Sequence, residues 1–206
     1  PRAAKSIAAS KTLKIVALGS SSTLGTGGSG ASTAWPARLE AELKQRLAGV
    51  DVTVVNKGLM RQSVPQMLAR IQRDVIAQHP DLVVWEAGTS EAVRGVDVEM
   101  LTEGLLTGID KLSQAGIEII LMDMQYARNT ARLINFQPYV EAVDRAAAMR
   151  DVYVFPRHEL MRQWVESEQV RFEDKTLKQA VRLADDIYAC IAKNLAAVIA
   201  HSVLRN

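Results

Sequence analysis

Hydrophobic residues fall along this chain in short blocks that alternate between two spacings. Blocks of the first kind are rich in β-branched residues and have the length of strands; they cover residues 13–18, 52–55, 82–85, 117–122 and 152–155. Segments of the second kind have apolar positions three and four apart; they cover residues 33–47, 64–78, 96–114, 136–149 and 160–168. Strands that alternate with helices predict a parallel sheet covered by helices on both faces.

The two ends of the chain differ in pattern. Residues 1–11 are small and polar, and we expect a loosely ordered lead-in. From residue 176 onward, apolar side chains recur every three or four positions, at Leu177, Val181, Ala184, Tyr188, Ile191, Leu195 and Val198. This pattern predicts one long helix over residues 176–204. No linker or repeat interrupts the chain, so we interpret residues 1–206 as one domain.

Composition narrows the class of protein. A length of 206 residues with 48% hydrophobic content suits one compact core. Lys and Arg number 25 against 23 Asp and Glu, so the charge does not call for a nucleic acid or an anionic membrane as partner. No apolar run approaches the roughly 20 residues of a membrane helix, and we expect no membrane span. The first residue is not Met, which suggests that a leader, such as a signal peptide, precedes it.

Metal and cofactor chemistry finds little support in the sequence. The single cysteine, Cys190, excludes an internal disulfide and a cysteine-rich metal site, and its apolar neighbours predict that it fills the core. No group of residues has metal-ligand spacing, so we expect neither a metal nor a cofactor. The glycine-rich segment 25–30 lacks the lysine of a phosphate-binding loop. We interpret it as a flexible rim, with phosphate binding as an alternative that no motif supports.

The most informative stretch follows the first predicted strand. Gly19 is succeeded by Ser20, Ser21, Ser22 and Thr23. A strand that turns into small hydroxyl residues leaves side chains and N–H groups at the carboxyl edge of the sheet, where open α/β folds bind ligands. The turn therefore predicts the functional site. Ser21 is either a nucleophile in that site or a residue that only caps a short helix.

Several blocks of the sequence resemble the SGNH or GDSL hydrolases. Residues 19–25 match the first block, residues 56–58 the second, with Gly58 in the oxyanion region, and residues 88–90 the third; further shared stretches cover residues 35–39, 93–97 and 188–190. The resemblance implies a three-layer α/β/α sandwich with a flavodoxin-like, five-stranded parallel sheet of order 2-1-3-4-5. It also implies a serine ester hydrolase whose nucleophile is Ser21.

Departures from the family pattern fall on the first block and on two oxyanion donors. Ser20 replaces an aspartate of the first block. Arg61 stands where the family has a glycine whose bare N–H helps to hold the oxyanion, so we expect this donor to be crowded. Ser90 replaces an asparagine whose side chain donates to the oxyanion, and serine is shorter. The resemblance thus implies a weakened oxyanion site.

The catalytic aspartate and histidine of the family also lack counterparts. Alignment on residues 188–190 places Gln179 at the aspartate and Arg182 at the histidine. Neither side chain can act as a general base near neutral pH. Residues 178–183 consist mostly of good helix formers, so we predict that the former catalytic loop has become helix.

A base from elsewhere in the chain is an alternative. His158 follows the fifth predicted strand and so lies on the carboxyl edge, either as a relocated base or as a surface residue at a helix start. His79 and His201 are interpreted as surface residues. Gln125 and Tyr126 follow the fourth strand, and we expect both beside the site.

Three carboxylates lie near strand ends, at Glu86, Glu91 and Asp123. Paired carboxylates can perform acid and base catalysis, but this spacing matches no known signature. We expect these carboxylates to form ion pairs with Arg61 and Arg182. The two arginines are either ordinary solvated residues or border the old pocket and attract anions.

Two functions follow from this reasoning. The preferred one is a catalytically inactive pseudo-hydrolase that acts as a binding or protein-interaction module. Its ligand would be a small anion, an acylated saccharide or a protein partner that docks over the crevice. The alternative is a serine esterase or deacetylase of acylated saccharides or other small esters, which uses Ser21 with a rearranged base. The resemblance to exported bacterial hydrolases implies a periplasmic or secreted protein.

Overall fold

A five-stranded parallel sheet forms the centre of the protein. The structure is a computed structural model that describes residues 2–169 and 176–205. The strands are β1 (Thr12–Gly19), β2 (Asp51–Gly58), β3 (Leu82–Glu86), β4 (Glu118–Met122) and β5 (Tyr153–Phe155), in the order β2-β1-β3-β4-β5. Each strand coincides with one of the predicted β-branched blocks, and the order is the one that the family resemblance implied.

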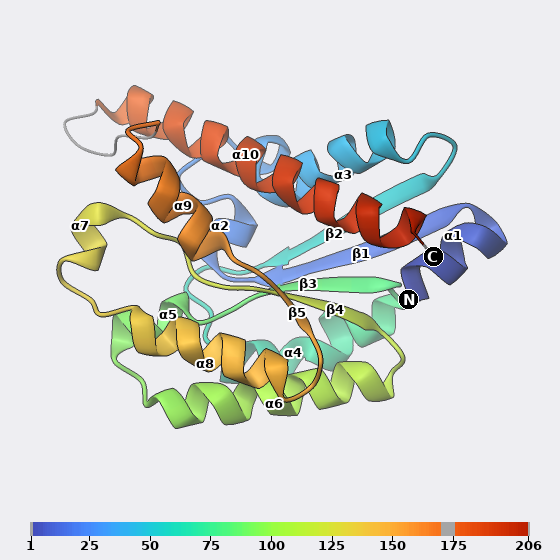
Figure 1. The fold of residues 1–206 in the computed structure, drawn as a ribbon, viewed down its shortest axis with the longest axis horizontal. Coiled ribbons are helices and arrows are strands. Elements are labelled where there is room, and N and C mark those ends of the chain that lie inside the picture. Colours follow the sequence, from blue (N-terminus) through green and yellow to red (C-terminus); the bar gives the residue numbers. More distant parts are fainter. Residues whose placement is uncertain (1, 170–175, 206) are drawn as a thin grey trace.

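Helices cover both faces of the sheet (Figure 1). On one face lie α1 (Arg2–Ser10), α3 (Trp35–Arg46), α9 (Arg157–Glu166) and α10 (Leu177–Leu204); on the other lie α4 (Val64–Asp74), α6 (Val98–Gln114) and α8 (Gln137–Ala148). Alternate residues of β1 enter the two cores: Ile15 and Ala17 pack in the first, and Val16 and Leu18 in the second. The two-residue period of a strand thus builds both layers of core from one segment.

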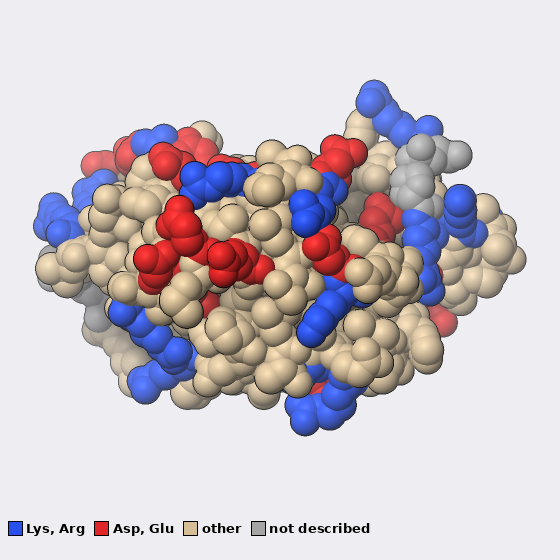
Figure 2. Space-filling model, turned by 90° about the horizontal axis from the view of Figure 1, so that it is seen from below, with Lys and Arg blue, Asp and Glu red and all other residues tan. Residues whose placement is uncertain are grey.

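Short helices gather at the carboxyl edge of the sheet, at the left of Figure 1. They are α2 (Ser21–Leu24), α5 (Thr89–Arg94) and α7 (Arg128–Ala131). Two 3₁₀ turns complete the elements: η1 (Ala31–Thr33) precedes α3, and η2 (Ile76–Gln78) lies between α4 and the start of β3. The predicted helix over residues 33–47 is thus found as α3 and is preceded by η1, whereas the predicted helix over residues 64–78 ends at Asp74 and is followed by η2. On the face seen in Figure 2, acidic and basic side chains are interspersed among uncharged ones.

The long C-terminal helix is confirmed, including residues 178–183. Thr176 and Gln179 form a capping box at its start, in which Gln179 Oε1 accepts the Thr176 N–H at 2.9 Å and Thr176 Oγ1 accepts the Gln179 N–H at 3.4 Å. The residue aligned with the catalytic aspartate therefore stabilises a helix start. Farther along, Ile191 and Leu195 pack in the core against the sheet and α3.

The expectation of no membrane-length apolar segment needs correction. By length and composition alone, α10 (Leu177–Leu204) is long and apolar enough to cross a membrane. The core helix of a globular domain passes the same test, because its inward face must be apolar. Its buried stripe accounts for that composition: Ile187, Ile191 and Leu195 are 7%, 1% and 0% exposed.

Two further expectations were wrong. The segment expected as a loose lead-in forms α1, whose Ala3 is buried and donates its N–H to Glu118 Oε2 at 3.1 Å. Arg2 also donates to the Gly116 carbonyl at 2.7 Å, so long-range contacts hold this helix. Cys190 is exposed and is no core residue. It lies one position before the buried Ile191, and one residue turns the side chain about 100° around a helix.

Because α6 packs closely on the sheet at Gly108, a methyl group added there should destabilise the fold. A Cβ there would lie 2.2 Å from Trp85 Cη2, inside a core in which Trp85 is fully buried. We expect Gly108→Ala to lower the free energy of unfolding by about 1–3 kcal/mol through overpacking, although alanine favours helix. Chemical denaturation measures this change. Ser113→Ala, at an exposed position of the same helix, is the control; equal stability of the two variants would contradict the packing argument.

Candidate functional site

A cavity of about 290 Å³ opens beside Ser21, at the carboxyl edge of β1 and β3. This is the point where the strand order reverses, because the chain passes from β1 to β2 on one side and to β3 and β4 on the other. Serine and threonine make up half of its lining residues: Ser20, Ser21, Ser22, Thr26, Thr89 and Ser90. We call this cavity the Ser21 pocket.

Ser21 is the first residue of α2, and its Oγ accepts the backbone N–H of Arg61 at 2.9 Å. Arg61 has a φ of +57°, in the left-handed region that favours glycine. The backbone here thus follows the course that a glycine would favour, and its N–H still points at the serine. The expectation that Arg61 crowds this donor was therefore wrong: the side chain changed and the donor stayed.

Gly58, assigned to the oxyanion region, has a structural part here. Its N–H donates to Asn56 Oδ1 at 2.8 Å, and Asn56 Nδ2 donates to the Thr23 carbonyl at 2.8 Å. A Cβ on Gly58 would lie 2.2 Å from the backbone nitrogen of Leu24, so only glycine lets β2 come this close to α2. These residues hold the serine turn against β2.

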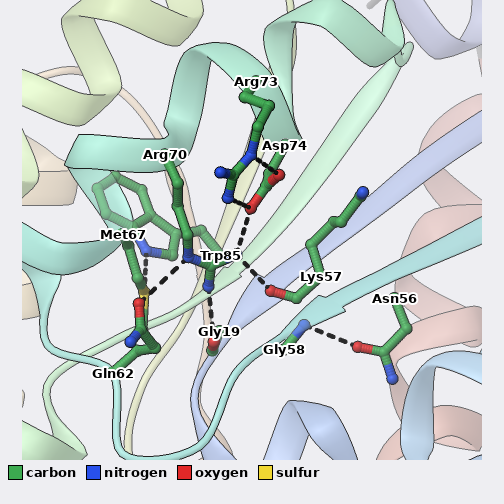
Figure 3. Close-up of polar contacts among 10 residues, drawn as sticks. All are labelled: Gly19, Asn56, Lys57, Gly58, Gln62, Met67, Arg70, Arg73, Asp74 and Trp85. Carbon is green, nitrogen blue, oxygen red and sulfur yellow. Dashed lines mark hydrogen bonds and ion pairs between the residues drawn. The ribbon is translucent and has the colours of Figure 1, made fainter.

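Arg70 buttresses the strand ends behind the serine turn (Figure 3). From α4, its guanidinium donates to the carbonyls of Gly19 at 3.1 Å and Lys57 at 2.8 Å, and pairs with Asp74 at 3.0 Å. Arg73 also binds Asp74, and hydrogen bonds from the two arginines outweigh partial burial and lower the pKa of this carboxyl to about 2. Paired with Asp74, Arg70 thus holds the carbonyl of Gly19, the residue that directly precedes the serine turn of the pocket.

A buried ion pair lies beneath the pocket. Glu86, at the end of β3, and Arg157, at the start of α9, are 2% and 1% exposed and approach to 3.3 Å. Glu86 also accepts hydrogen bonds from Thr23 Oγ1 at 2.5 Å and Ser20 N at 3.3 Å, and Arg157 Nη1 donates to Ser22 Oγ at 2.8 Å. Burial raises the pKa of Glu86, but Arg157 and these donors outweigh it, so the net pKa is lowered.

Ser90 and Thr89 contribute two more hydroxyls, which form only a long hydrogen bond or none among the described residues. Ser90 lies in the pocket, as expected, with its Oγ 3.5 Å from Ser20 Oγ. Thr89 Oγ1 is buried and has no hydrogen-bond partner in the described part of the chain. A buried hydroxyl without a partner is costly, so this atom is suited to a ligand.

Several sequence-predicted residues lie outside the Ser21 pocket. Gln179 and Arg182 are exposed on α10 and do not line it. The His158 ring packs edge-on against Tyr126, with ring centroids 5.3 Å apart, and lines a groove beside α7. Gln125 does line the Ser21 pocket, whereas Tyr126 lines the neighbouring cavity.

The expected ion pairs of the edge carboxylates were also wrong. Glu86 pairs with Arg157, while Glu91 accepts the Val64 N–H and Asp123 accepts the His158 N–H at 2.7 Å. Burial raises the pKa of Glu91, and it raises that of Asp123 to about 7 against opposing backbone hydrogen bonds. Both carboxylates thus anchor the first turns of helices, α4 and α9, where orphan N–H groups need acceptors.

Sequence reasoning missed several residues of the site: Arg157 lies beneath it, and its lining also includes Thr26, Thr89, Val93, Arg94 and Tyr188. Arg157 follows β5 after Pro156 and precedes His158 at the same edge, which was the available signal. Tyr188 donates to the Thr26 carbonyl at 2.7 Å, and burial raises its pKa to about 12, so it stays protonated near neutral pH.

Comparisons with known proteins agree with this architecture. The model of the Non-GDSL lipase-like family matches residues 1–205. Esterase TesA of Pseudomonas aeruginosa is 30% identical over 67% of this chain and 64% of its own length, and an arylesterase of Vibrio mimicus is 28% identical over 46% of each. The chain thus spans less than two thirds of either relative. The crystal structure of Axe2, an acetylxylan esterase from Geobacillus stearothermophilus, has a TM-score of 0.68 at 18% identity, covering 87% of this chain and 94% of that one.

Removing one partner of the buried Glu86–Arg157 ion pair should cause a large loss of stability. Arg157→Met leaves Glu86 buried without its counter-charge, and we expect about 3–5 kcal/mol less free energy of unfolding. The double variant Arg157→Met, Glu86→Leu removes both charges and should regain most of it. Arg162→Met, which loses only exposed ion pairs on the same helix, should cost far less stability. Denaturant titrations give these values, and a double variant no better than Arg157→Met would refute the charge argument.

The raised pKa of Asp123 should make the stability of the fold depend on pH. Its pKa is near 3.8 without the fold and about 7 within it, so between these pH values the folded chain binds more protons than the unfolded one. Stability should therefore fall as the pH rises from about 4 to 7, by up to about 1.4 kcal/mol per pH unit from this group. Asp123→Asn should flatten the curve of melting temperature against pH, whereas Asp186→Asn, at an exposed site, should leave it unchanged. Parallel curves for wild type and Asp123→Asn would refute the assignment.

Proposed function

The chain belongs to the Non-GDSL lipase-like family, and from this premise we propose that its Ser21 pocket binds a small anionic ligand without hydrolysing esters by the family mechanism. The observation that carries the proposal is the surroundings of Ser21. Within the described residues, its Oγ has one hydrogen-bond partner, the N–H of Arg61, which cannot accept a proton.

The rest of the lining offers no better base. A serine hydroxyl needs an adjacent group that takes its proton. No histidine lines the pocket among the described residues, Glu86 has a lowered pKa and is occupied by Arg157 and Thr23, and Tyr188 is protonated. Loss of triad function commonly costs on the order of 10⁴ or more in rate. Turnover should therefore be slight.

Binding of an anion, by contrast, has several supports. Arg61 and Arg94 lie at the exposed margin of the pocket, and the negative charge of Glu86 beneath it is compensated by Arg157. Thr89 Oγ1 adds a donor that no described residue engages. Hydrogen bonds from hydroxyls and guanidinium groups favour a carboxylate or a similar anion.

A second candidate function is a serine esterase or deacetylase, and one observation favours it. The N–H of Arg61 lies 2.9 Å from Ser21 Oγ, so it is near the place where an oxyanion would form on an acyl group attached to this oxygen. The names of its relatives, two esterases and an acetylxylan esterase, agree with this candidate and extend it to acylated saccharides. The proposal also includes a periplasmic or secreted location, by resemblance to exported hydrolases.

An esterase assay separates the two candidates. With p-nitrophenyl acetate, wild type and Ser21→Ala should release nitrophenol equally slowly, because neither has a base for the hydroxyl. Ser32→Ala, an exposed serine outside the pocket, is the matched control. In parallel, a carboxylate ligand in excess should raise the melting temperature of wild type. Turnover that Ser21→Ala abolishes and Ser32→Ala retains would establish the esterase and sink the proposal.

A further inference from the structure

A second cavity adjoins the Ser21 pocket. It has a volume of about 180 Å³ and lies between α9 and α10, and we call it the apolar chamber. Thr26, Gln125 and Tyr188 line both cavities, so the two share a boundary. Within this boundary the Tyr188 hydroxyl donates to the Thr26 carbonyl at 2.7 Å. A ligand that occupies both cavities therefore has to pass beside Gln125 or displace this hydrogen bond.

The chamber differs from the pocket in chemistry. Its remaining lining includes Met161 from α9, Leu183, Ala184 and Ile187 from α10, and the Tyr126 ring. Charged residues are absent from the lining among the residues that the structure describes. The hydroxyls and arginines thus lie in the Ser21 pocket, whereas mostly apolar side chains line the chamber.

The first turns of α10 form one wall of this chamber. Leu183 and Ala184 directly follow Arg182, which aligns with the catalytic histidine of related hydrolases. The capping box at Thr176 and Gln179 fixes where this helix begins. The segment that carries the base in related hydrolases here presents apolar side chains toward the chamber.

We propose that the apolar chamber is the second compartment of the ligand site, and that the ligand is a carboxylate with an apolar tail of one ring or a few carbons. This inference rests on the proposed function, since the carboxylate occupies the Ser21 pocket. Size decides the tail: a buried apolar cavity of about 150 Å³ is known to bind benzene, and the chamber is slightly larger. A long acyl chain does not fit within it.

A homologous series of ligands tests the tail. We expect the affinity of wild type, measured by isothermal titration calorimetry, to rise from acetate through butanoate to hexanoate by about fourfold per methylene. Benzoate and 4-phenylbutyrate probe a ring in place of a chain. The gain should stop once the chamber is filled, and hexanamide, which lacks the charge, should bind more weakly than hexanoate.

Substitutions in the wall of the chamber test whether the apolar tail of the ligand binds there. Ala184→Leu fills the chamber and should abolish the gain with chain length, while Ala189→Leu, on the same helix but outside both cavities, should keep it. Leu183→Ala enlarges the chamber and should move the best chain length upward, which tests the idea even if Ala184→Leu folds poorly. Arg94→Gln should weaken every carboxylate by a similar factor.

The outcomes distinguish this inference from the proposed function. Carboxylate binding that Arg94→Gln weakens, but that does not depend on chain length, would leave the proposed function intact and overturn the chamber. A length dependence that persists unchanged in Ala184→Leu and Leu183→Ala would also overturn it, because the tail would lie elsewhere. Failure of wild type to bind any carboxylate would overturn both.

Discussion

The buried pair of Glu86 and Arg157 is the interaction on which the carboxyl edge depends. Glu86 ends the central strand β3, and its carboxylate receives the serine turn through Thr23 and Ser20. Arg157 begins α9 and reaches Ser22 from the opposite side. Two buried charges are costly unless each meets a partner, so the position of the turn and the start of the helix are fixed together. The shape of the Ser21 pocket follows from this pairing.

The strands and the long helix could be predicted because their signals are local. Central strands of a parallel sheet are buried on both faces and read as apolar runs, as at Leu82 and Val83, and α10 carries a stripe and a capping box. The helix α1 escaped prediction because contacts with Gly116 and Glu118, more than 100 positions away, hold it. Sequence spacing cannot show such contacts.

The site was predicted in place but only partly in content. The hydroxyl turn located the pocket, since a strand end followed by Ser21 must lie at the carboxyl edge. The partner of Glu86 was misassigned because any of several arginines could reach that edge, and only the fold selects Arg157. The Arg61 N–H was misjudged for another reason. The sequence reveals that the side chain differs from glycine, but it does not reveal the backbone conformation, whose φ of +57° keeps the N–H directed at Ser21.

The capping box of α10 also limits which side chains of this helix could reach Ser21. Positions 179 and 182 belong to a regular helix, so an aspartate and a histidine placed there would stand on its exposed surface, away from Ser21. A working base would require the first turns to unwind, and each glycine introduced for that purpose costs about 1 kcal/mol in a helix interior. Placing such a base beside Ser21 in this chain would therefore require backbone and side chains to change together.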